Sequence, residues 1–126
     1  MNLVLDAGAF LAVERGDRDT AALIKNQLLA GRTPVTHGGI VGQVWRGGGA
    51  RQAHLARLLP AIDIQGLDDA LGRRAGVLLG QARLSDVIDA AIVLLAADGD
   101  VILTSDPNDL TPLAAAAGLH VDIVSV

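Results

Sequence analysis

Short apolar runs alternate along the chain with longer segments of helical periodicity. The apolar runs predict strands, because a run without a polar face suits the middle of a parallel sheet. The predicted strands cover residues 2–5, 33–36, 61–64, 100–104 and 120–126. The predicted helices begin near Ala9 and cover residues 17–30, 40–46, 51–59, 68–79, 85–97 and 107–117. This alternation favours right-handed crossovers and a three-layer α/β/α sandwich with a central, mostly parallel sheet.

The composition limits the kind of protein that the chain can form. Its 126 residues are 51% hydrophobic but only 2% aromatic, so we expect a single domain, 1–126, with an aliphatic core. The cleanest apolar run, 90–97, is far shorter than the ~18 residues of a membrane span. No basic segment precedes an apolar stretch, as it does in a signal peptide, and there is no cysteine. We therefore expect a cytoplasmic protein with no membrane association and no disulfides.

The charged residues are of unusually few types. The net charge is −4, which argues against bulk attraction to nucleic acid. Glu14 is the only glutamate among 14 acidic residues, and Lys25 is the only lysine among 10 basic ones. Aspartate is a good ligand for hard cations, and arginine binds phosphate through its forked guanidinium. Local arginine patches remain compatible with binding a nucleic acid backbone.

An aspartate follows an apolar strand at two places. Asp6 comes directly after 3–5, and Asp106 comes after 101–104 and a single serine. Open α/β sheets bind their ligands at the carboxyl ends of strands, so both carboxylates stand where a site is expected. Each also has a purely structural interpretation, because aspartate caps helices well and Asp106 precedes a proline. Asp109 has the same alternative as a first-turn acid.

A third acid lies in the helix predicted over 85–97, with Ser85 as its favourable cap. The residues around Asp89 are apolar on every side of that helix, which predicts that the helix is buried. A buried carboxylate without a partner costs several kcal/mol or becomes protonated, so Asp89 needs a partner or a cation. Asp86 lies on the same face but nearer the end, where interaction with the helix N-terminus is the favoured interpretation.

These acids predict a metal site at one end of the sheet. A cluster of carboxylates repels itself unless a cation lies among them. Aspartate oxygens without nearby histidine or cysteine suit Mg²⁺ or Mn²⁺ rather than zinc. Other chemistries lack their motifs, since the chain has no phosphate-binding loop, no dinucleotide fingerprint and no serine nucleophile elbow. The three histidines are interpreted as surface or packing residues, and Trp45 as a core or interface residue with base stacking as the alternative.

The ordered set of these motifs resembles the PIN-domain family. The resemblance rests on Leu3-Val4-Leu5-Asp6 with Ala7-Gly8-Ala9-Phe10, on Asp89-Ala90 and on Leu103-Thr104-Ser105-Asp106, and it covers nearly the whole chain. The length suits the VapC-type toxins of toxin–antitoxin pairs. The resemblance implies a Mg²⁺- or Mn²⁺-dependent ribonuclease that hydrolyses RNA phosphodiesters. It also implies a homodimer that a small antitoxin protein keeps silent.

One position departs from the family pattern. The helical acid, usually glutamate, is expected within 40–45, and this chain has Gln43 there. A carboxamide still coordinates or hydrogen-bonds through its oxygen, but it carries no charge. The resulting hypothesis assigns catalysis and metal binding to Asp6, Asp89 and Asp106, with supporting roles for Gln43, Thr104, Asp86 and Asp109.

Three arginines are candidates for binding RNA phosphates: Arg15, Arg46 and Arg51, with a solvated surface as the alternative for each. Two other function classes stay open. A PIN-like binding module without turnover would act through its antitoxin or RNA. A magnesium-dependent phosphatase or phospho-acceptor would require a lysine near the carboxylates, and Lys25 lies on a distant helix.

Overall fold

A sheet of five parallel strands runs through the middle of the molecule, and the computed structural model describes residues 1–126. The strands are β1 (Leu3–Leu5), β2 (Val35–His37), β3 (Asp63–Gln65), β4 (Val101–Thr104) and β5 (Asp122–Ser125). Their order across the sheet is β3-β2-β1-β4-β5. The central pair runs in the register from Leu3↔Val101 to Leu5↔Leu103. Every pairing is parallel, so the prediction of a mostly parallel sheet is confirmed.

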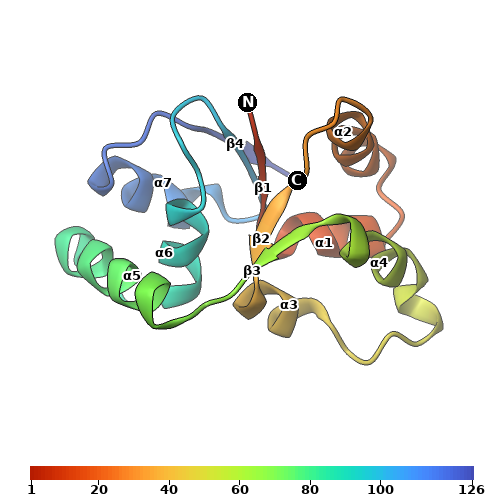
Figure 1. Ribbon diagram of the computed structural model, residues 1–126, viewed down its shortest axis with the longest axis horizontal. Helices are drawn as coiled ribbons and strands as arrows, with labels where there is room; N and C mark the ends of the chain where they lie inside the picture. Colours follow the sequence, from red (N-terminus) through yellow and green to blue (C-terminus); the bar gives the residue numbers. More distant parts are fainter.

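Helices cover both faces of this sheet and complete the predicted three-layer α/β/α sandwich (Figure 1). One side carries α1 (Ala7–Glu14), α2 (Arg18–Leu29) and α4 (Ala53–Leu58), with α3 (Gly38–Val44) at its lower edge. The other side carries α5 (Asp69–Ala82), α6 (Val87–Leu94) and α7 (Pro107–Ala116). Two 3-10 turns, η1 (Ala50–Gln52) and η2 (Leu59–Ala61), flank α4. None of these helices has the length and apolar composition that crossing a bilayer requires.

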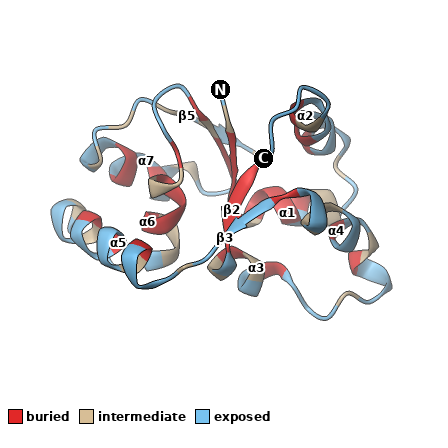
Figure 2. Ribbon diagram, in the orientation of Figure 1, coloured by how far each residue is buried: buried red, intermediate tan, exposed pale blue.

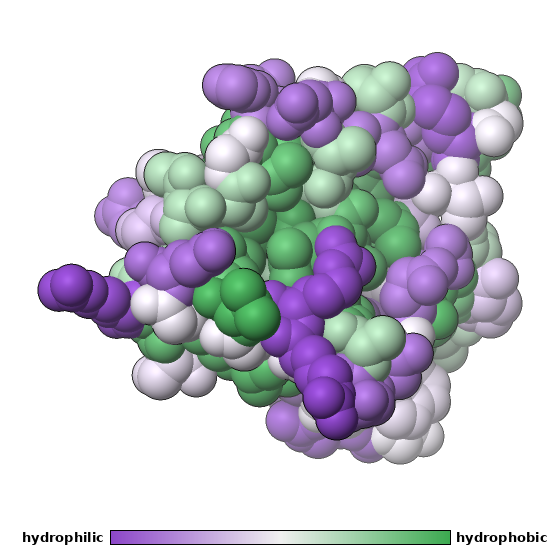
Figure 3. All heavy atoms as spheres, turned by 60° about the vertical axis from the view of Figure 1, so that its left-hand side comes forward, coloured by the Kyte–Doolittle hydropathy of each residue, from purple (hydrophilic) through white to green (hydrophobic).

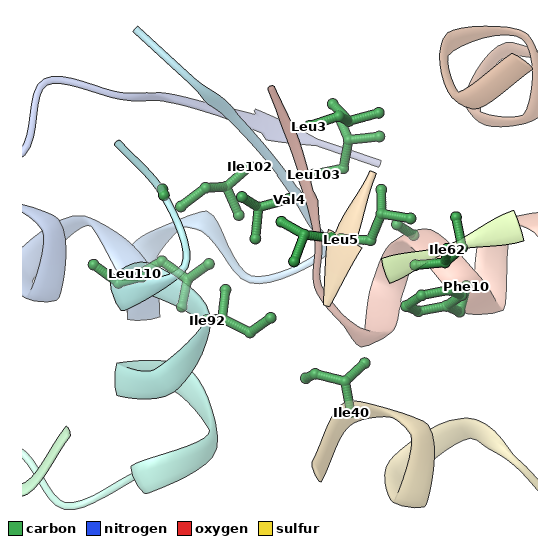
Figure 4. Close-up of a cluster of buried hydrophobic side chains, with 14 of the residues drawn as sticks. Leu3, Val4, Leu5, Phe10, Ile40, Ile62, Ile92, Ile102, Leu103 and Leu110 are labelled. Atoms are coloured by element: carbon green, nitrogen blue, oxygen red, sulfur yellow. The ribbon is translucent and has the colours of Figure 1, made fainter. Parts of the chain in front are cut away.

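The core lies around the two central strands. Val4, Leu5 and Ile102 are fully buried, and Figure 2 shows that burial falls off toward the outer sides of the helices. In Figure 4, Phe10 approaches the sheet from α1, while Ile92 approaches it from α6 on the opposite side. Each such side chain contributes about 1.5–3 kcal/mol when it leaves water. The predicted aliphatic core is confirmed, with Phe10 as its only phenylalanine.

Most element boundaries differ from the predicted ones by a few residues, and the helix around Asp89 differs most. It begins at Val87 and ends at Leu94, and its N-cap is Asp86, so the prediction that Ser85 caps it is wrong. Asp86 is the N-cap because its carboxylate accepts a hydrogen bond from the backbone N–H of Asp89 at 3.1 Å. Val87 is 38% exposed, so the expectation of burial on every side fails in the first turn.

The strand order reverses its direction of winding between β1 and β4. Crossovers that leave β1 toward β2 and β3 place helices on one face, and the return to β4 and β5 places helices on the other. The carboxyl ends of these two strands therefore border the crevice where open α/β sheets bind ligands. Gly8 lets the two strand ends approach, since a Cβ there would lie only 2.6 Å from the backbone nitrogen of Ser105.

We expect Gly8→Ala to destabilise the protein by about 1–3 kcal/mol, because the added methyl group overlaps backbone that cannot move aside cheaply. Gly76→Ala is the matched control, since Gly76 lies inside α5 with nothing near its missing Cβ. That variant should gain about 0.5–1 kcal/mol from helix propensity. Urea unfolding of both variants measures the difference, and equal changes would contradict the close approach at Gly8.

Candidate active site

Asp6 and Thr104 meet where β1 and β4 end side by side, although 98 positions separate them. The Thr104 hydroxyl donates a 2.7 Å hydrogen bond to Oδ2 of Asp6 and accepts a 3.0 Å bond from the backbone N–H of Asp106. The backbone N–H of Asp6 donates to the Leu103 carbonyl oxygen at 3.0 Å. Both side chains are buried, Asp6 being 5% and Thr104 0% exposed. One hydroxyl thus fixes the orientation of Asp6 and the path of the chain into α7.

Three helices begin at this site with an aspartate at the N-cap position: Asp6 for α1, Asp86 for α6 and Asp106 for α7. Only Asp86 uses its carboxylate as a cap, which confirms its structural interpretation. The carboxylates of Asp6 and Asp106 form no bond to their helices, so capping does not explain them. Asp106 and Asp109 are exposed, and Asp109 lies in the first turn of α7. The positive ends of the helix dipoles reduce the repulsion among these acids.

All of these acids affect the pKa of the Asp89 carboxyl group. Its pKa is raised to about 6, first because burial disfavours the charged form and then because other carboxylates surround it. In decreasing order of effect, those carboxylates belong to Asp86, Asp6, Asp109 and Asp106. Asp89 is half-buried in the first turn of α6. Acids from separate parts of the chain therefore act on a single carboxyl group.

A cavity of about 270 Å³ opens beside Asp89, between α6 and α7. Its polar lining consists of Ser85, Asp86, Asp89, Asn108 and Asp109. Asp6 and Asp106 lie outside this lining. As the side chains stand, no three carboxylate or histidine groups converge closely enough to hold a metal ion.

His37 joins α3 to α6 behind the acids. It is fully buried, its Nδ1 accepts the N–H of Gly39 at 3.1 Å, and its Nε2 donates to the carbonyl oxygen of Ile88 at 3.0 Å. Burial lowers the pKa of His37, so the ring stays neutral in the tautomer that these two bonds require. Gly39 makes the contact possible, because a Cβ there would lie 2.5 Å from Ile88 Cδ1. The first turn of α6, and Asp89 with it, is thereby held to the end of β2.

Gln43 lines a second cavity. It is exposed on α3 and shares this cavity of about 530 Å³ with Arg46 and Arg51. None of the aspartates discussed above lines this cavity, and its only acid is Glu14. Arg15 is exposed at the end of α1 and does not line it. The structure thus gathers two of the three candidate arginines around Gln43, and the acids around Asp89.

Gln52 organises the wall of that second cavity, a role that the sequence pattern does not predict. Its Nε2 donates to Oε1 of Glu14 at 2.7 Å and to the Val44 carbonyl oxygen at 2.8 Å. Its Oε1 accepts the backbone N–H groups of Arg46 at 2.8 Å and Gly48 at 3.1 Å. The side chain is buried and uses both donors and both acceptor positions. An isolated glutamine after a glycine-rich stretch carries no sequence signal for such a role.

Comparison with known proteins supports the fold. No protein-family model matches the chain, and no curated protein has a matching sequence. Among solved structures, the chain is similar to one in the crystal structure of VapBC2 from Rickettsia felis bound to a DNA fragment from its promoter. The TM-score is 0.67, and the match covers 98% of this chain and 99% of that one at 11% sequence identity. The likeness shows the PIN-like three-layer fold that the sequence predicts.

Proposed function

We propose that the protein is a metal-dependent endoribonuclease of the PIN type that acts as the toxin of a toxin–antitoxin pair. The observation that carries the proposal is the group of four aspartates around Asp89, which helps to raise its pKa to about 6. Strongly perturbed carboxylates at the ligand-binding end of an α/β sheet are typical of catalytic sites. The VapBC2 likeness in fold supports the same function class.

Mg²⁺ or Mn²⁺ is the cofactor that fits this donor set. All of the donors are carboxylate oxygens, which suit hard cations, and a divalent ion would relieve the repulsion that Asp89 senses. In this proposal Asp6, Asp89 and Asp106 hold the ion, while Asp86 and Asp109 support them. Asp106 and Asp109 are exposed, so their side chains are able to turn toward a cation without disturbing the core. When bound, the ion supplies a more acidic water and stabilises negative charge on the phosphate.

The chain's own residues orient the acids and hold a proton. Thr104 occupies Oδ2 of Asp6, which leaves Oδ1 without a hydrogen-bond partner and available as a ligand. The raised pKa of Asp89 lets protons compete with cations at mildly acidic pH. Arg46 and Arg51, and with them Arg15, are assigned to the RNA phosphates, because carboxylates alone repel RNA.

The proposed partners are a small antitoxin protein and a second copy of the chain, both in the cytoplasm. Apolar side chains remain exposed on α2, where Leu23 is 45% and Leu29 75% exposed. Figure 3 brings the side of α5, α6 and α7 forward and shows hydrophobic residues gathered at its centre within a hydrophilic border. A cavity of about 410 Å³ on this side is lined by Val77, Leu78 and Leu94. Surfaces of this kind are typical of association sites.

A PIN-like binding module without turnover is the second candidate. It is favoured by the absence of three converging ligands and by the position of Gln43 at the other cavity. Such a protein would bind RNA or an antitoxin through the same fold. Divalent ions would then leave its melting temperature unchanged, whereas the proposed nuclease gains stability from them.

We expect Asp6→Asn, Asp89→Asn and Asp106→Asn each to lower Mg²⁺- or Mn²⁺-dependent cleavage of structured RNA by about 10–100-fold or more. Each change removes one charge from the proposed cation site while keeping the size of the side chain. Asp69→Asn is the matched control, because Asp69 is exposed on α5 and pairs only with Arg73. Cleavage that survives in all three variants, or in the presence of a chelator, would contradict the proposal.

The raised pKa of Asp89 also predicts how stability depends on pH. The pKa of Asp89 is raised from its ordinary value of 3.8 to about 6 in the folded state, so the folded state binds protons more readily than the unfolded state. Ionisation of this residue therefore destabilises the fold as pH rises from about 4 to 6. We expect Asp89→Asn to be more stable than the natural protein above pH 6, by about 1 kcal/mol after allowing for solvent screening. The two proteins should converge near pH 4.

Carbon-detected NMR titration of the Asp89 carboxyl group measures the pKa directly, and thermal unfolding across pH measures the stability. Asp122→Asn is the control, since it removes an exposed acid at the start of β5, which pairs with Val101 at the end of β4 opposite to the acids. A normal pKa at Asp89, or equal pH dependence of both variants, would contradict the electrostatic picture.

A further inference from the structure

The cavity beside Gln43 has the size and polarity of a ligand site. Its volume of about 530 Å³ falls within the roughly 300–1,000 Å³ typical of small-molecule sites. It lies between α1, the end of α3 and the turn η1. The side chains that matter here are Leu11, Glu14, Gln43, Arg46, Arg51 and Gln52.

The wall of this cavity is fixed in place before any ligand arrives. Gln52 ties the loop after α3 to Glu14 on α1 through its four hydrogen bonds. Trp45 braces the same loop, because its ring lies against Gly48, where a Cβ would be 2.6 Å from Cη2. Gly48 has a φ of +74°, a conformation that other residues adopt only with strain. A preformed wall reduces the entropy lost on binding.

The charge around the cavity differs in sign from that of the whole chain. Two arginines and one glutamate line it, whereas the net charge of the protein is −4. The Nη1 group of Arg46 donates hydrogen bonds to the carbonyl oxygens of Gly42 and Trp45, at 3.1 and 2.7 Å. Its other N–H donors have no partner. Arg51 is exposed and has no hydrogen-bond or ion-pair partner. Donors of this kind suit a phosphate group.

The remaining polar groups suit the edge of a nucleobase. The carboxamide of Gln43 offers a donor and an acceptor side by side, as in bidentate pairing with a base. Glu14 bonds Gln52 through Oε1 only, which leaves Oε2 as a further acceptor. Trp45 is 36% exposed and adjoins the lining residue Arg46, so its ring offers a stacking surface next to the cavity.

The elements that border the two cavities follow one another in the fold. In Figure 1 the first turn of α6, helix α3 and the loop after α3 follow one another along the lower edge of the molecule. A strand whose scissile phosphate lies at the acids would therefore pass α3 and reach the loop. The positive charge of the two arginines suits a further phosphate of a strand whose scissile phosphate is held at the acids through a cation.

We propose that this cavity binds one nucleotide of single-stranded RNA flanking the cleavage site. Arg46 and Arg51 hold its phosphate, Gln43 and Glu14 contact the edge of its base, and the neighbouring base stacks on Trp45. The proposal rests on the proposed function, since it takes RNA as the substrate of the same protein. Gln43 then contributes to sequence selectivity, and its neutral side chain avoids repelling the strand.

The test measures binding of fluorescein-labelled decanucleotides of rA, rC, rG and rU at several salt concentrations, in a chelator so that no cleavage occurs. Arg51→Ala should lower the slope of log affinity against log salt by about 0.7, which is about fivefold in affinity at 0.1 M salt. Gln43→Ala should leave that slope unchanged but reduce the spread of affinities among the four oligomers. Arg74→Ala and Gln81→Ala, both exposed on α5, are the matched controls.

The expected result is a loss in the two cavity variants and none in the two controls, with unchanged melting temperatures in all four. Equal behaviour of Arg51→Ala and Arg74→Ala would overturn the proposal, as would binding of adenosine monophosphate without binding of RNA. Cleavage by the natural protein with Mg²⁺ is assayed separately. If RNA binding depends on the cavity residues but no cleavage occurs, only the proposed nuclease activity is rejected. If cleavage occurs and is unchanged by Arg51→Ala and Gln43→Ala, only the proposed nucleotide site is rejected.

Discussion

The hydrogen bond from Thr104 to Asp6 is the contact on which the arrangement of the site depends. It joins the ends of the two central strands. The same hydroxyl accepts a hydrogen bond from the backbone N–H of Asp106 at the start of α7. Sheet order alone makes β1 and β4 neighbours, but it leaves their following turns free to diverge. The Thr104 bridge and the missing side chain of Gly8 draw those turns together. A first-strand acid and a late-strand acid thus become parts of one site.

Carboxylates gathered in this way work against the stability of the fold. The raised pKa of Asp89 shows that its charged form is disfavoured by burial and by its neighbours. Three helix N-termini offset part of this cost, because α1, α6 and α7 all begin at the acids. The neutral ring of His37 adds a support that introduces no further negative charge. Proteins retain such unfavourable groups mainly where they serve a function, which favours chemistry over packing as their explanation.

The sequence predicted the features that depend on local pattern. Short apolar runs predicted the five strands and their order along the chain, and the fold class is confirmed by the parallel sheet. The start of α6 was missed because Ser85 and Asp86 are both good caps, and only the geometry selects Asp86. The roles of Gln52 and His37 were missed for a different reason. Both depend on partners far away in the chain, and a single buried polar residue leaves no periodic signal.

Gln43 occupies the position at which the PIN-domain pattern has an acid, but its surroundings suit a different role. The family pattern expects an acid in this helix, and a carboxamide there reads at first as a weakened metal ligand. In the structure Gln43 lines a cavity together with two arginines and Gln52, while the acids lie at the starts of α1, α6 and α7. A carboxylate at Gln43 would sit beside Glu14 and cancel the positive charge that the arginines supply. The neutral side chain is therefore better matched to its surroundings than the expected acid would be, and the departure from the pattern fits the proposed division between an acidic site for cleavage and a basic site for binding the strand.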